Sequence, residues 1–284
     1  MNYLLTRIII DSKVSKIVLF ILYMIFQQTQ VLYINVNLGS YTHFVESILL
    51  FAEKRISSYL CVANVHMCIE AYQDKAFAEV VNGADMVTPD GMPLVKALKW
   101  LYGIKQDRVA GMDLLPDLLR EAEIKDISVF FYGGTQDILD KTADYCRKYY
   151  PSLRLAGLLS PPFRELTITE KDDYINQINN SGAGFVFVAL GCPKQEKWMA
   201  AMKGKVHACM VGIGGALPVM IGLQKRAPKW MQEASLEWLY RFMQEPKRLF
   251  KRYLVTNSLF ICLIISEKWR LLFMRNSNSG PSLS

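Results

Sequence analysis

The stretch that decides the fold is Phe185-Val186-Phe187-Val188-Ala189-Leu190, followed by Gly191-Cys192-Pro193-Lys194-Gln195-Glu196. A short, unbroken apolar run predicts a strand that is buried on both faces. The glycine and proline after it predict a turn, and the pattern from Lys194 to Met202 predicts a helix. A buried strand that leads through a turn into a helix is typical of a parallel sheet covered by helices.

The same order of elements recurs through residues 32–224. Short apolar runs alternate there with longer amphipathic stretches, which predicts an α/β, Rossmann-like domain with a largely parallel sheet and flanking helices. The predicted strands are Tyr59–Asn64, Met86–Thr88, Ser128–Tyr132, Arg154–Leu158, Phe185–Leu190 and His207–Ile213. The predicted helices are Ser40–Lys54, Pro93–Tyr102, Leu114–Ala122, Gln136–Tyr149, Glu170–Asn179 and Lys194–Met202.

Composition excludes several classes of protein. The 284 residues are 51% hydrophobic and 21% charged, which is too apolar for a disordered chain and too charged for a polytopic membrane protein. The six cysteines form no Cys-x-x-Cys pair, which fits a reducing cytosol. None of the three histidines stands at ligand spacing with a cysteine or another histidine, so we expect no structural zinc site.

Charge divides the chain into a neutral body and a basic C-terminal appendage, residues 225–275. The net charge of +7 lies entirely in the appendage, which predicts an anionic partner: a membrane surface, a nucleotide diphosphate, a lipid pyrophosphate or nucleic acid. Helices are predicted from Lys229 to Met243 and from Lys247 to about Val255. The second is basic on one side and apolar on the other, and the apolar side could pack on the body or lie in a lipid interface.

The two ends of the chain are set apart from the predicted domain. Residues 1–31 form an apolar extension whose longest run, Ile17–Phe26, is too short to span a bilayer as a helix. No small-x-small cleavage site follows, so we do not expect secretion. A membrane-surface anchor and translation from an early start codon both remain open. Residues 276–284 are polar and predicted to be disordered.

Three predicted strands end in glycine-containing turns, which contain Gly133 and Gly134, Gly191, and Gly214 and Gly215. In open parallel sheets, ligands bind beyond the carboxyl ends of the strands, although each of these glycines is also explained by turn chemistry alone. The first strand is not followed by Gly-x-Gly-x-x-Gly, and the chain has no Gly-x-x-x-x-Gly-Lys-Ser/Thr loop. Neither NAD nor ATP is therefore indicated, and we expect no cofactor.

Polar residues at two neighbouring strand ends are candidate site residues. Asp90, in Thr88-Pro89-Asp90-Gly91, is interpreted as a general base or as a helix N-cap. Asn64 is either a ligand contact or an ordinary turn asparagine, and Gln195 either a ligand contact or a surface amide. Because the chain has no Asp-x-Asp, we expect no metal, and the cationic role at a diphosphate would fall to arginines. Arg241, Arg248 and Arg252 are spaced so that at least the last two share a helical face.

The chain resembles a known family in eight motifs. These are Ala63-Asn64-Val65-His66-Met67, Ala84-Asp85-Met86-Val87-Thr88-Pro89-Asp90-Gly91, Arg108-Val109-Ala110-Gly111-Met112-Asp113-Leu114, Phe131-Tyr132-Gly133-Gly134, Gly191-Cys192-Pro193-Lys194-Gln195-Glu196, Arg226-Ala227-Pro228-Lys229-Trp230-Met231-Gln232, Glu237-Trp238-Leu239-Tyr240-Arg241 and Gln244-Glu245-Pro246-Lys247-Arg248. Over residues 32–257 it resembles the WecG/TagA/CpsF glycosyltransferases.

The resemblance implies an inverting, metal-independent enzyme at the cytoplasmic face of the membrane. Such an enzyme moves a sugar, typically N-acetylmannosamine or its uronic acid, from a UDP-sugar to undecaprenyl-diphosphate-linked N-acetylglucosamine. Carried over by motif, Asp90 is the base, and Arg241, Arg248 and Arg252 close over the site and stabilise the departing UDP. The predicted substrate-binding residues are Asn64, Thr88, Gly91, Gly133, Gly134, Gly191, Pro193, Lys194, Gln195, Gly214 and Gly215.

Two features depart from the family, and alternatives stay open. Val62 stands where members often have threonine, and the apolar extension is atypical. The donor could instead be UDP-glucuronic acid, UDP-glucose or UDP-galactose. The protein could also be a non-catalytic module that binds a UDP-sugar or a polyprenyl phosphate. Nucleic acid is not an expected partner, because the cations alternate with an apolar face rather than with stackable aromatics. The oligomeric state is open, a homo-oligomer included.

Overall fold

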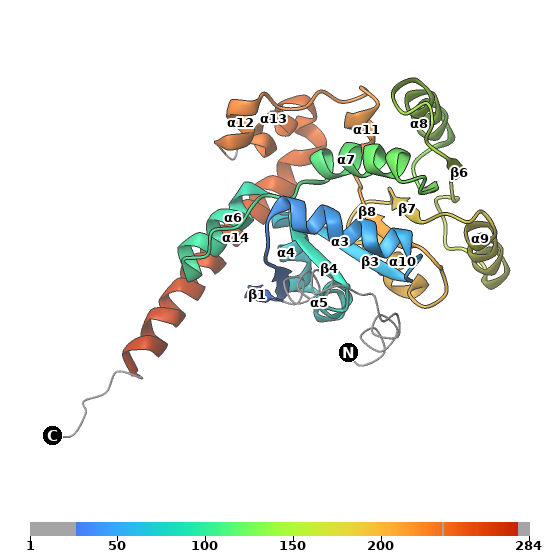
Figure 1. The fold of residues 1–284 in the computed structure, drawn as a ribbon. Coiled ribbons are helices and arrows are strands. Elements are labelled where there is room, and N and C mark those ends of the chain that lie inside the picture. Colours follow the sequence, from blue (N-terminus) through green and yellow to red (C-terminus); the bar gives the residue numbers. More distant parts are fainter. Residues whose placement is uncertain (1–26, 235, 278–284) are drawn as a thin grey trace.

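The computed structural model of the protein describes residues 27–234 and 236–277 and contains a six-stranded parallel sheet (Figure 1). The strand order is β4-β3-β8-β7-β5-β6, and every neighbouring pair is parallel. The strands are β3 (Ser58–Ala63), β4 (Met86–Pro89), β5 (Val129–Tyr132), β6 (Leu155–Leu159), β7 (Phe185–Val188) and β8 (Cys209–Gly212). The predicted α/β, Rossmann-like class and all six predicted strands are confirmed, with shifts of one or two residues at the ends.

Helices cover both faces of the sheet because successive strand residues point to opposite sides. In β3, for example, Tyr59 and Cys61 join one buried apolar cluster, and Leu60 and Val62 join the other. The first cluster contains side chains of α4 (Val65–Gln73), α5 (Lys75–Asn82), α6 (Met92–Tyr102), α9 (Ile168–Asn180) and α10 (Lys194–Met202). The second contains side chains of α3 (Tyr41–Glu53), α7 (Gly111–Ile124), α8 (Gln136–Tyr149) and α11 (Ala216–Met220).

Five elements of the body lie outside the sequence predictions. Helices α4, α5 and α11 are three of them. The other two, β1 (Gln28–Val31) and β2 (Ile34–Asn37), form an antiparallel hairpin that begins inside the range assigned to the N-terminal extension. Val31 is fully buried, and the Asn37 side chain accepts a hydrogen bond from the Val87 amide at 2.8 Å, so the hairpin is fixed beside β4. The remainder of the extension, residues 1–26, lies outside the described part of the chain.

The appendage consists of α12 (Lys229–Glu233), α13 (Glu237–Gln244) and α14 (Pro246–Ser277). The prediction of one helix from Lys229 to Met243 is wrong, because the chain turns between α12 and α13. The prediction that the next helix stops near Val255 is also wrong, because α14 is 32 residues long. It packs against α4 and α6 and projects beyond the sheet (Figure 1). Residues 278–284, most of the tail predicted to be disordered, are not among the described residues.

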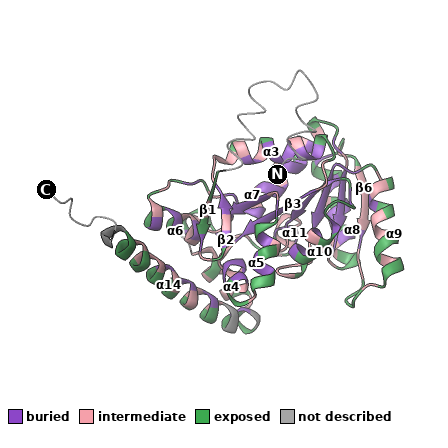
Figure 2. Ribbon diagram, turned by 90° about the horizontal axis from the view of Figure 1, so that it is seen from below, coloured by how far each residue is buried: buried purple, intermediate pink, exposed green. Residues whose placement is uncertain are grey.

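Two faces of α14 are apolar. Leu249, Phe260 and Ile264 are buried against the body. The adjacent face, here called the outer stripe, carries Phe250, Leu254, Ile261, Ile265, Trp269, Leu272 and Phe273, each at least 43% exposed. Figure 2 shows the contrast between the buried strands and this largely exposed helix. Within residues 27–234 and 236–277, no helix combines the length and the apolarity that crossing a bilayer requires.

Candidate active site

A pocket of about 410 Å³ lies where the carboxyl ends of β4, β3, β8 and β7 meet the appendage. These four strands are consecutive in the sheet, so the residues that follow them converge at one edge. Helices α13 and α14 supply further lining residues, among them Trp238, Arg241 and Tyr253. The pocket therefore has a floor of strand ends and a wall contributed by the appendage.

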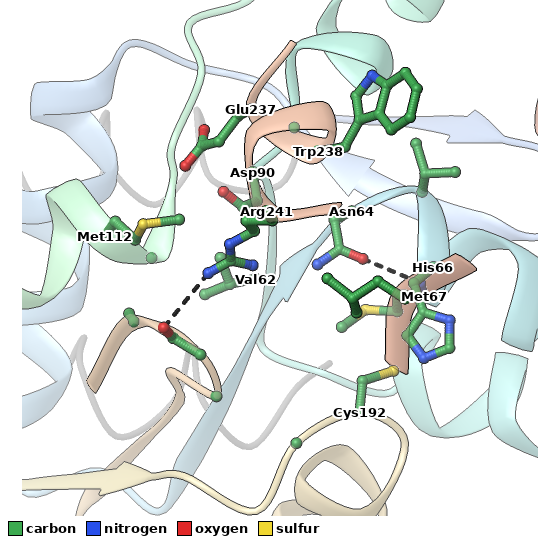
Figure 3. A pocket seen from close by; sticks show the side chains of 18 of the residues that line it. Val62, Asn64, His66, Met67, Asp90, Met112, Cys192, Glu237, Trp238 and Arg241 are labelled. Carbon is green, nitrogen blue, oxygen red and sulfur yellow. Dashed lines mark hydrogen bonds between the residues drawn. The ribbon is translucent and has the colours of Figure 1, made fainter. Parts of the chain in front are cut away.

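Asp90 follows β4 and points into this pocket (Figure 3). Its backbone amide donates to the carbonyl of Ala63 at 2.8 Å, which holds it beside the end of β3. The N-cap of α6 is Gly91, which has no side chain to cap with, so the interpretation of Asp90 as an N-cap is wrong. The carboxyl of Asp90 therefore does not cap a helix.

Asn64 caps a helix and also lines the pocket, while its predicted contact with a ligand stays a prediction. It is the N-cap of α4, where its Oδ1 accepts a hydrogen bond from the Met67 amide at 3.2 Å. Its side chain also makes a hydrogen bond to Asp90. The cap fixes the asparagine side chain, and the asparagine in turn orients the carboxyl.

The surroundings of Asp90 make it a stronger base than an ordinary aspartate. Burial is the largest cause and, with the nearby carboxylate of Glu237, raises the pKa of Asp90 to about 6. Arg241, Arg108 and the hydrogen bond from Asn64 act in the opposite direction and limit the rise. Asp90 is thus mainly ionised at neutral pH and still basic enough to accept a proton from a hydroxyl group.

Gln195 is the second polar group on the pocket floor. Its Oε1 accepts a hydrogen bond from the Gly191 amide at 3.2 Å, and its Nε2 donates to Glu196 Oε1 at 2.7 Å. Glu196 is fully buried, and burial raises the pKa of its carboxyl. A Cβ at Gly212 would lie 2.9 Å from Gln195 Nε2, so a glycine is required there. The amide is buried between two strand ends, which excludes the interpretation of Gln195 as a surface amide.

The appendage and the body are joined at the pocket by ion pairs. Arg108, in the segment before α7, contacts Asp113 and Glu237, each at 2.9 Å. Asp113 also contacts Arg226 of the appendage at 2.6 Å. Arg241, one turn beyond Glu237, extends into the pocket and donates to the carbonyl of Gly215 at 3.5 Å (Figure 3). A cation of the appendage therefore lies at the glycine-rich turn after β8.

The pocket brings together eight of the thirteen predicted site residues whose side chains the structure describes, and the other five lie outside its lining. Those that line it are Asn64, Asp90, Gly91, Gly191, Gln195, Gly214, Gly215 and Arg241. Thr88 does not, because it is fully buried and its hydroxyl donates to the Val109 carbonyl at 3.4 Å. Pro193 and the exposed Lys194 stand at the start of α10, outside the lining.

Gly133 and Gly134 are not among the residues that line the pocket. They follow β5, which lies one strand beyond β7, the last of the four strands whose ends form the pocket floor. Gly133 has a φ of 108°, and a Cβ there would lie 2.8 Å from the backbone of Ala189, so packing explains it. Arg248 and Arg252 belong to the first turns of α14, but their side chains lie outside the described part of the structure. Roles in binding or catalysis for these residues stay predictions.

Two charged pocket residues, Arg108 and Glu237, were not among the predicted site residues. Both lie inside motifs that carry the family resemblance, which was the available signal. Neither residue directly follows a strand. The expectation that ligands bind beyond strand ends, which located Asp90 and Asn64, therefore does not predict Arg108 or Glu237. Among the described residues, no cluster of three or more His, Cys, Asp or Glu is placed to hold a metal ion.

Comparison with known proteins identifies the family. Residues 29–273 match the model of the glycosyl transferase WecG/TagA/CpsF family. The chain is 29% identical, over 85% of its length and 91% of the relative, to the N-acetylglucosaminyldiphosphoundecaprenol N-acetyl-beta-D-mannosaminyltransferase of Bacillus subtilis (strain 168). It is 30% identical, over 76% of its length and 82% of the relative, to the enzyme of the same name from Bacillus spizizenii. With the motifs, the fold and the match all agreeing, this chain belongs to the WecG/TagA/CpsF family of glycosyltransferases.

Proposed function

We propose that the protein transfers N-acetylmannosamine, or its uronic acid, from a UDP-sugar to undecaprenyl-diphosphate-linked N-acetylglucosamine, with inversion and without a metal ion. The observation that carries this proposal is the pairing of a basic carboxyl, Asp90, with the guanidinium of Arg241 in one pocket. The activity named for the two Bacillus relatives supports the acceptor and the sugar.

The pocket suggests a single displacement. Asp90 accepts the proton of an acceptor hydroxyl, and the hydroxyl oxygen attacks the anomeric carbon of the donor. The bond from that carbon to UDP breaks at the same time, and UDP leaves with the electron pair. Arg241, joined on the proposed mechanism by Arg248 and Arg252, binds the negative charge that develops on the diphosphate. Attack from the side opposite to UDP inverts the configuration of the sugar.

The decisive experiment measures UDP release in detergent with EDTA present. The assay combines the purified protein, a short-chain polyprenyl-diphosphate N-acetylglucosamine and a panel of UDP-sugars that includes glucuronic acid, glucose and galactose. Acceptor-dependent release with UDP-N-acetylmannosamine or its uronic acid is expected. Release with another sugar alone would change the donor. If UDP binds but no donor supports release, the non-catalytic module is favoured.

The pH dependence of the reaction tests the role of Asp90. Because Asp90 must be ionised to accept a proton and its pKa is about 6, kcat/KM should rise with pH and level off above roughly pH 7. Below pH 6 it should fall about tenfold per pH unit, since the ionised fraction falls in that proportion. Steady-state rates from pH 4.5 to 8.5 measure this fall of kcat/KM on the acid side. A fall with its midpoint near pH 4 would contradict the raised pKa of Asp90.

The outer stripe of α14 supports a place for the protein on the inner face of the cytoplasmic membrane. It presents aromatic and branched apolar residues, Trp269 and Phe273 among them, along one side of the helix. A helix of this composition binds at a lipid interface with its apolar side toward the acyl chains and its cations near phosphates. The acceptor proposed above would be found at that surface.

Vesicle sedimentation tests this placement. The double substitution Trp269→Ser and Phe273→Ser should lower partitioning onto vesicles with anionic lipid about tenfold or more, because two large side chains leave the interface. Phe163→Ser is the matched control, since Phe163 is 90% exposed on the body. An unchanged partition coefficient in the double variant, or a change only in self-association by light scattering, would contradict membrane binding by this stripe.

A further inference from the structure

The guanidinium of Arg108 is held by groups from both sides of the boundary between body and appendage. Its Nη1 donates to Glu237 Oε2 at 2.9 Å. Its Nη2 donates to Asp113 Oδ2 at 2.9 Å and to Gln232 Oε1 at 3.2 Å. The side chain of Arg108 is only 16% exposed, so these bonds are made largely out of water. Glu237 and Gln232 belong to the appendage, and Asp113 belongs to the body.

Glu237 faces Asp90 as well as Arg108. It is the first residue of α13, and its side chain points to the same part of the pocket as the carboxyl of Asp90 (Figure 3). One of its oxygens accepts from Arg108, while the other, Oε1, is buried with no hydrogen-bond partner in the described part of the chain. A carboxylate oxygen that is buried without a hydrogen-bond partner lowers the stability of the fold. Its presence here needs a functional explanation.

Arg108 forms an ion pair with Glu237 and also acts on the charge of Asp90. Arg108 already lowers the pKa of Asp90 from its present position, although it makes its bonds elsewhere. An arginine that loses one of its carboxylate partners tends to bind another carboxylate within reach. Asp90 lines the same pocket as Arg108, and an ion pair with arginine would make it a much weaker base.

We propose that Glu237 is a positioning residue for the transfer reaction: it binds Arg108 and so keeps Asp90 free to accept the proton of the acceptor. This inference rests on the proposed role of Asp90 as the base. It adds that the appendage supplies a carboxylate to the site, besides its arginines. The base is then fully prepared only when α13 is docked on the body.

Charged and polar side chains from three parts of the chain act on Asp90. Glu237 and Arg241 act from α13, Arg108 from the segment before α7, and Asn64 donates from the end of β3. The other titratable side chains that line the pocket are His66, Cys192, Lys225, Glu245 and Tyr253.

The test is the titration of Asp90 in Glu237→Gln, a substitution that keeps the shape and removes the charge. Carbon-13 NMR of labelled aspartate carboxyls follows it without turnover, and Asp90→Asn assigns the signal. The midpoint should move down by about one pH unit or more, because a repelling anion is lost and Arg108 is released. The acid limb of kcat/KM should move with it, and the plateau rate should fall about tenfold or more.

Two further variants make the result specific. Glu233→Gln, at an exposed position on the neighbouring helix α12, removes the same charge and should leave the midpoint unchanged. The double variant Arg108→Gln with Glu237→Gln removes both partners of the ion pair, so the midpoint should return toward that of the wild type. The double variant also serves if the single variant does not fold, because it leaves no unpaired buried charge.

Three outcomes would overturn the proposal. The Asp90 midpoint could stay in place in Glu237→Gln while the rate falls, which would make Glu237 a docking contact only. Both could stay unchanged. The double variant could keep the low midpoint of the single one, which would show that Glu237 does not act through Arg108. Wild-type activity in Asp90→Asn is a different result, because it would refute the proposed function itself.

Discussion

Asp90→Asn should lower kcat by about 10²- to 10⁴-fold, the range expected when a positioned acid–base group is removed. The amide has nearly the same shape as the carboxyl and cannot accept a proton from the acceptor hydroxyl at neutral pH. Because Arg241 and the strand-end glycines are untouched, the affinity for UDP should change less than threefold. Initial rates of UDP release give the first quantity, and isothermal titration with UDP gives the second.

A matched variant separates this effect from a general loss of negative charge. Asp172→Asn removes a carboxylate from the exposed surface of α9, outside the pocket lining, and should leave kcat unchanged. If Asp90→Asn turns over at a near-normal rate, Asp90 is not the base, and another group must accept the proton.

Arg241→Ala should cost about 10²- to 10³-fold in kcat, the loss typical of removing one donor that stabilises charge in a transition state. Arg241 lies at the carbonyl of Gly215, on the turn where a diphosphate would be bound if the proposed mechanism is correct. Arg241→Lys should recover part of the rate, because it restores the charge but not the planar pair of donors.

The control for Arg241 is Lys229→Ala, which removes a cation from an exposed position of the same appendage outside the pocket lining. It should leave kcat within twofold of the wild type. Vesicle binding should be the same in both variants. A defect of Arg241→Ala that is confined to vesicle binding would mean that this arginine contacts lipid instead of the departing UDP.

The sheet was predictable because each of its strands is a short apolar run, as expected when both faces are covered. The α4–α5 region was harder. Asp74 ends α4 and caps α5, so the two short helices never form one long periodic pattern. The β1–β2 hairpin gives little signal either, since its strands contain glutamines and asparagines and Leu32 takes the left-handed conformation in which glycine is usual.

The part of the candidate site that is formed by residues following strands could be predicted from the sequence. Asp90 and Asn64 follow the neighbouring strands β4 and β3, and Gln195 comes after β7, which is separated from β3 only by β8. A residue that follows a strand is recognisable in a sequence. Arg108 and Glu237 form a tertiary pair 129 residues apart, which no local pattern announces. Gly133 and Gly134 follow β5, one strand beyond the four whose ends line the pocket, and that position is a property of topology rather than of the turn itself.

The length of α14 has a geometric consequence. Tyr253 lines the pocket, and Phe273 ends the outer stripe, so about 30 Å of continuous helix separates the two at the usual rise per residue. In the proposed membrane-bound orientation, the length of this helix sets the height of the catalytic pocket above the lipid. Inserting or deleting two residues between Ile265 and Trp269 would turn the stripe beyond them by roughly 200° and change that height without touching any pocket residue.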